Sequence, residues 1–183
     1  MFGSNSEPVQ LYRNCAAVLI PSGDEVILRR GTNGFITQAL GGSFTVYVDG
    51  SLFRIDGGNA DALGKDPVPP PQLPPGASRE DLEKLVWEQM KTCFDPEIPI
   101  NVVDLGLIYR CETVKLEDGQ YRIEVDMTLT APGCGMGDIL VLDVRSKLEI
   151  IPRVKRAAVE LVFDPPWSQE MMSEAARLQT GMY

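Results

Sequence analysis

Apolar and polar residues alternate along two short runs, 44–48 and 51–55. Alternation with a period of two predicts two strands that share an apolar face. Asp49-Gly50 lies between the runs and is a strong signal for a two-residue hairpin turn. With further glycine-rich turns at 31–34 and 41–42, the pattern predicts a small all-β unit over residues 1–65.

The stretch that follows is dense in proline and reads DPVPPPQLPPGAS. Such a run favours an extended polyproline II conformation and offers few backbone donors to a helix or sheet. We therefore expect residues 66–77 to form a semi-rigid linker between the β unit and a larger unit, residues 78–183.

The larger unit begins at a predicted helix that Ser78 caps, with Asp81 three residues later in a near capping-box arrangement. Helical and alternating periods then follow one another along the chain. The predicted order is helix 78–93, strands 107–115 and 121–130, a helix around 140–148 that Pro152 ends, strand 154–163, and a last helix capped by Ser168. This order predicts an α+β fold, a small mixed sheet with helices.

Composition and charge narrow the function. With 26 acidic against 17 basic residues, the net charge of −9 argues against nucleic-acid and anionic-membrane partners. No apolar run reaches the ~20 residues that span a bilayer, and the N-terminus lacks signal-peptide features, so we expect a cytoplasmic protein. Because the chain has no histidine, Cys–His and Ser–His–Asp catalysis and the common zinc hydrolase sites are excluded within one chain.

The four cysteines are Cys15, Cys93, Cys111 and Cys134, and no two are spaced as C-x-x-C. In a reducing cytosol they are expected to be free thiols, and their spacing argues against a complete zinc or iron–sulfur site. For the first three, packing is the favoured interpretation.

Cys134 carries the strongest chemical signal because it lies in the sequence PGCGMG between a strand and a helix. Glycines leave a thiol unscreened, and the N–H groups that begin the next helix favour a thiolate. A thiolate binds soft metals such as Fe(II). The alternative, a glycine-rich turn that holds an incidental small residue, is about equally favoured by the local pattern.

The second candidate is the loop DPEIPINVVD, with Asp95, Pro96, Glu97 and Asp104. Its carboxylates are hard oxygen ligands for a metal or acceptors for backbone N–H groups. Turn formation is the more common role for such residues. If the loop and Cys134 lie at the same end of the sheet, they would form a mixed acid–thiolate pocket.

Two motifs, DPEIPINVVDLGLIY and TLTAPGCGMGD, resemble the metal–sulfur cluster biosynthesis family related to the PaaD oxygenase subunit. The C-terminal DPPWSQEMMSEAARLQTGM and an N-terminal extension resemble its SufT-type branch, so the resemblance spans about residues 11–182. It implies an iron–sulfur cluster assembly fold, with the family cysteine at Cys134, its acidic loop at Asp95, Pro96, Glu97 and Asp104, and its threonine at Thr130. Related members often have proline after the cysteine, where this chain has glycine.

The resemblance implies a non-enzymatic role in assembling iron–sulfur clusters or delivering them to client apoproteins, with SUF-type assembly proteins as partners. Cys134 would hold a transient cluster or iron, and no stably bound cofactor is the alternative. Two other functions stay open, a metal-free adaptor between the SUF machinery and clients, and a thiol-dependent redox or transfer enzyme. A homodimer is the base-rate expectation.

Overall fold

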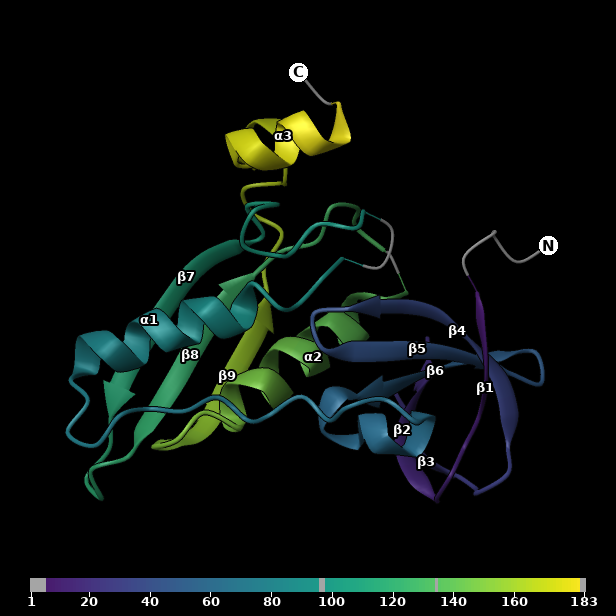
Figure 1. Ribbon diagram of the computed structural model, residues 1–183. Coiled ribbons are helices and arrows are strands. Elements are labelled where there is room, and N and C mark those ends of the chain that lie inside the picture. Colours follow the sequence, from purple (N-terminus) through teal and green to yellow (C-terminus); the bar gives the residue numbers. More distant parts are fainter. Residues whose placement is uncertain (1–5, 96–97, 134, 182–183) are drawn as a thin grey trace. The chain divides into compact units, whose positions relative to one another are not determined.

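The computed structural model describes residues 6–95, 98–133 and 135–181 (Figure 1). The chain divides into two compact units, Met1–Pro70 and Pro71–Tyr183. The division lies inside the segment 66–77 that the proline pattern marks as a linker, and residues 66–74 have neither helix nor strand. Within the described residues, no helix is both long and apolar enough to cross a bilayer.

The first unit is an antiparallel sheet with strand order β1-β4-β5-β6-β2-β3. The elements are β1 (Glu7–Gln10), β2 (Cys15–Ile20), β3 (Glu25–Leu28), β4 (Asn33–Leu40), β5 (Ser43–Val48), β6 (Ser51–Asp56) and the 3-10 helix η1 (Gly57–Leu63). The predicted hairpin is confirmed, because β5 and β6 pair and Asp49 and Gly50 both have positive φ, 46° and 88°. Val46 and Ile55 lie on its apolar face and are fully buried.

The second unit has the predicted element order around a mixed sheet, β7-β8-β9. Its elements are α1 (Arg79–Met90), β7 (Ile108–Lys115), β8 (Tyr121–Met127), α2 (Gly137–Glu149), β9 (Val154–Leu161), the 3-10 turn η2 (Gln169–Met171) and α3 (Glu174–Thr180). β7 is antiparallel to β8, whereas β9 is parallel to it. Helices α1 and α2 lie along one face of this sheet (Figure 1) and share its core.

Local chemistry explains why α1 and β8 form where they do. Ser78 and Asp81 make a complete capping box, in which each side chain accepts the other residue's backbone N–H. Alternate residues of β8, such as Ile123 and Val125, are buried against the helices, while Glu124 between them faces the other side.

Four predicted boundaries were wrong. Helix α1 ends at Met90, three residues before the predicted end at Cys93. The last helix begins after Ser173, whose side chain accepts the N–H of Ala176; Ser168 makes no such bond. β8 ends at Met127 and β9 at Leu161, two to three residues earlier than predicted. Thr128 continues the alternation of β8 on the side of Glu124 and Asp126 but is buried, and its backbone N–H donates to the carbonyl of Leu107, just before β7.

Candidate functional site

Three chain segments converge at one end of the β7-β8-β9 sheet. β8 and β9 both end there, and β7 begins there because it runs in the opposite direction. The Thr128 N–H donates to the Leu107 carbonyl at 2.8 Å, and the Val162 N–H donates to the Met127 carbonyl at 2.8 Å. The acidic loop before β7, the turn after β8 and the segment after β9 therefore meet at this sheet end.

The acidic loop is folded by its own side chains. Asp95 is buried, and its Oδ1 accepts the Ile98 N–H at 2.9 Å. Asn101 donates from its amide nitrogen to Asp104 Oδ2 at 2.6 Å, and its Oδ1 accepts the backbone N–H groups of Val103 and Asp104. These bonds support the turn-forming role of both aspartates.

The turn after β8 carries Thr130, which is half-buried, and continues through exposed Ala131, Pro132 and Gly133 to exposed Gly135. Gly133 has a φ of +79°, so the bend uses a conformation that favours glycine. A Cβ on Gly135 would meet nothing within 4 Å. The predicted ligand Cys134, and the predicted loop residues Pro96 and Glu97, lie outside the described residues.

Helix α2 starts directly after this bend. No described side chain caps its first turn, and the N-cap position is Met136. The backbone N–H groups of an uncapped first turn carry partial positive charge and lack helical acceptors. Gly137 lets the helix start close to the sheet, because a Cβ there would lie 2.7 Å from Leu129 Cδ1.

The other three thiols are poor candidates for chemistry. Cys15 and Cys93 are buried, and burial raises the pKa of the Cys15 thiol. Cys111 is half-buried, and its pKa is raised to about 11, mainly because burial disfavours the thiolate. Among residues 6–95, 98–133 and 135–181, no group of three or more Cys, Asp and Glu side chains is arranged to hold a metal ion.

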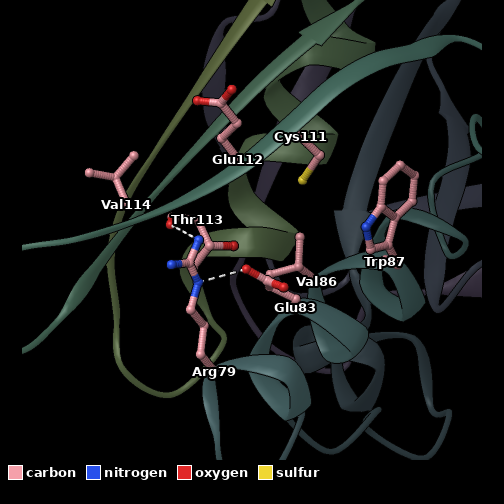
Figure 2. Close-up of a pocket in the computed structure, with 8 residues that line it drawn as sticks. All are labelled: Arg79, Glu83, Val86, Trp87, Cys111, Glu112, Thr113 and Val114. Atoms are coloured by element: carbon pink, nitrogen blue, oxygen red, sulfur yellow. Dashed lines mark hydrogen bonds and ion pairs between the residues drawn. The ribbon is translucent and has the colours of Figure 1, made fainter.

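Cys111 lines a separate hollow of about 240 Å³ between α1 and β7 (Figure 2). Arg79 crosses it, donating from Nε to Glu83 at 2.8 Å and from Nη2 to the Thr113 carbonyl at 2.9 Å. Trp87 borders the hollow and is 39% exposed. This hollow contains none of the site residues predicted from the sequence.

Sequence reasoning missed the C-terminal segment as part of the sheet end. The Trp167 indole N–H donates to the Leu105 carbonyl at 2.7 Å, and the Ser173 N–H donates to the Asp104 carbonyl at 2.8 Å. Proline and tryptophan in DPPW were the available signal, but nothing in their spacing identifies a partner 62 residues away.

The second unit is a small α+β unit with a glycine bend at one end of its sheet. Its sequence and structure are similar to those of known proteins. The profile described as iron–sulfur cluster assembly protein matches residues 83–161, within the second unit. The chain is 44% identical over 99 residues to an Fe-S protein maturation auxiliary factor from Porphyromonas gingivalis; the match covers 54% of this chain and 90% of that protein. It is 39% identical over 89 residues to the Fe-S protein maturation auxiliary factor SufT from Staphylococcus aureus, covering 49% and 97%.

The chain therefore belongs to the family of iron–sulfur cluster assembly proteins, in the PaaD-like group that includes SufT. It also matches a crystal structure of a domain of unknown function from Bacillus anthracis, at 32% identity and a TM-score of 0.48, over 57% of this chain and 95% of that one. The profile contains no residue of the first unit, so the likeness of the N-terminal extension to the SufT-type branch stays a prediction.

Proposed function

We propose that this protein is an auxiliary factor in the maturation of iron–sulfur proteins, and that Cys134 holds iron or a cluster as a transient thiolate ligand. Family membership and the names of the two relatives support the maturation role. The cluster is cargo in this proposal, and the protein acts as a carrier rather than an enzyme.

The observation that carries the ligand role is the exposed glycine bend that leads into the uncapped start of α2. Exposed residues on both sides of position 134 support access from solvent, and the N–H groups of an uncapped helix start favour a negative charge beside them. Because the other three thiols are buried or have no neighbouring ligand cluster in the described part of the chain, Cys134 is the residue to test.

Incomplete ligation suits a carrier. A cluster held by few protein thiolates leaves readily when a client offers more of them, so the remaining ligands would come from a second subunit or from the client. The expected partners are SUF-type assembly proteins and client apoproteins.

Anaerobic reconstitution with iron and sulfide tests this proposal. Wild type should gain visible absorption and iron, and Cys134→Ser should lose most of both. Cys111→Ser is the matched control, because it removes one thiol of raised pKa and should load as wild type does. Equal iron content and absorption in wild type and Cys134→Ser would show that Cys134 is not a ligand.

One observation favours a second candidate, a metal-free adaptor. Asp95 and Asp104 each use a carboxylate oxygen to shape the loop, which suits a preorganised recognition surface. An adaptor should still bind SUF components in a pull-down, and still support client activity, when it carries Cys134→Ala. A variant that loses client activity would exclude this candidate.

A further inference from the structure

The C-terminal segment, residues 165–173, donates two hydrogen bonds to the end of the acidic loop, which continues through Leu105 and Gly106 into β7. Trp167 donates its indole N–H to the carbonyl of Leu105, and the backbone N–H of Ser173 donates to the carbonyl of Asp104. Leu105 is fully buried, so its carbonyl has no access to bulk water and needs a protein donor. Trp167 comes from a part of the chain 62 residues away and supplies that donor.

The next residue of the loop is in direct contact with the same segment. Gly106 has a φ of +72°, and a Cβ there would lie 2.1 Å from the carbonyl oxygen of Met171. The hydroxyl of Tyr109 donates to the Pro165 carbonyl at 2.8 Å and lies 3.5 Å from the Met171 sulfur. The segment is therefore fastened to the loop and to the start of β7.

The residues that follow these contacts are part of the core of the second unit. Met172 and Ala176 follow the contact residues and are 3% and 2% exposed. The segment is thus packed as part of the unit, although the family profile ends at residue 161.

We infer that residues 165–173 set the conformation of residues 101–107, where the acidic loop leads into β7, and that Trp167 and Gly106 are positioning residues for the sheet-end site. Trp167 holds the loop through its hydrogen bond to the Leu105 carbonyl. Gly106 has no side chain, which leaves room for the backbone of Met171. The inference rests on the proposed function only in assigning the loop a part in handling cargo. The contacts themselves are independent of that function.

The loop offers a direct readout, because its amides are bonded within it. The N–H groups of Leu105, Gly106 and Leu107 donate to carbonyls of the same loop at 3.0 Å. Hydrogen exchange of a peptide that covers residues 101–107 therefore measures how often the loop opens.

Gly106→Ala and Gly119→Ala form a matched pair. Both glycines have positive φ, +72° and +80°, so both substitutions strain the backbone, but a Cβ at Gly119 meets nothing within 4 Å. Gly106→Ala should speed exchange in residues 101–107 about tenfold or more relative to Gly119→Ala. Trp167→Phe keeps an aromatic ring and removes the indole donor, and it should also speed exchange about tenfold there, since one hydrogen bond to a buried carbonyl is of that order.

Iron loading under anaerobic reconstitution is measured on the same samples. Gly106→Ala and Trp167→Phe should load less iron than Gly119→Ala at equal folded fraction by circular dichroism. If Gly106→Ala does not fold, Trp167→Phe against wild type decides. Wild-type exchange in residues 101–107 of both variants would overturn the inference, and so would fast exchange with undiminished loading. If wild type itself takes up no iron, the proposed function fails, and exchange alone still decides whether the segment positions the loop.

Discussion

Lys147 is a buried cation on α2, and replacing it with methionine tests how the two helices are held together. Its Nζ donates to the Thr92 carbonyl at 2.5 Å, just beyond the end of α1, and lies 3.5 Å from Asp143 Oδ1. The side chains of Lys147 and Asp143 are only 8% and 10% exposed. Because Thr92 lies three residues before Asp95, this contact joins α2 to the start of the acidic loop.

The structure allows the cost of Lys147→Met to be worked out. A hydrogen bond from a charged donor contributes about 1.5–3 kcal/mol, and removing one member of a buried ion pair costs about 3–5 kcal/mol. Methionine retains most of the aliphatic volume, so little is lost to a cavity. We expect the free energy of unfolding to fall by about 3 kcal/mol. With a urea m-value of about 1.5 kcal/mol/M, the unfolding midpoint should fall by about 2 M.

Tryptophan fluorescence is the appropriate assay, because both tryptophans, Trp87 and Trp167, lie in the second unit. Lys155→Met is the matched control: its partner Asp118 is exposed, and the midpoint should stay near that of wild type. If Lys147→Met shifts the midpoint no more than Lys155→Met does, at an unchanged m-value, the reasoning about this buried pair is refuted. In the double variant that also carries Asp143→Leu, most of the lost stability should return, because neither member of this ion pair is left buried without the other.

Three further predictions concern the site and the first unit. Gly137→Ala forces a Cβ against a buried leucine and should lower stability by about 1–2 kcal/mol in urea unfolding, whereas Gly135→Ala, which meets open space, should not; equal values would contradict the contact. With a pKa of about 11, Cys111 should react with iodoacetamide at neutral pH about 100-fold more slowly than a thiol of pKa 9, as timed mass spectrometry can show. The hydrogen bond from Arg13 holds the pKa of Asp61 below its usual value. The pair therefore stabilises the first unit at pH values above the usual pKa of an aspartate, and this stabilisation is lost as the pH falls through the lowered pKa. An NMR titration in which Arg13→Gln leaves the Asp61 pKa unchanged would refute this.

The features that the sequence predicted well are local ones. Asp49-Gly50 specifies its turn because both residues adopt positive φ, and Ser78 with Asp81 caps α1 through groups three residues apart. The order of elements in the second unit followed from apolar periods, together with the helix signals at Ser78 and Pro152. Each of these depends on neighbours along the chain, so no tertiary information was needed.

Where the local signal was ambiguous, tertiary packing decided. The sequence predicted Ser168 as the cap of the last helix, but Met172 is buried in an extended conformation, with φ −68° and ψ 147°. The helix can begin only after that anchor, so Ser173 is the cap. In the same way, Thr128 continues the alternation of β8 and is nevertheless buried, at the sheet end where its backbone N–H is bonded to Leu107.

For the candidate site, the sequence alone pointed to the glycine bend and the acidic loop, because the properties of glycine, proline and carboxylate side chains follow from the residue type. It did not identify the roles of Gly106 and Trp167 in holding that loop. Those roles arise because the chain brings Trp167 to a buried carbonyl 62 residues away and brings Met171 against Gly106. Contacts at such separation depend on how the sheet and helices pack, and only the tertiary structure contains that information.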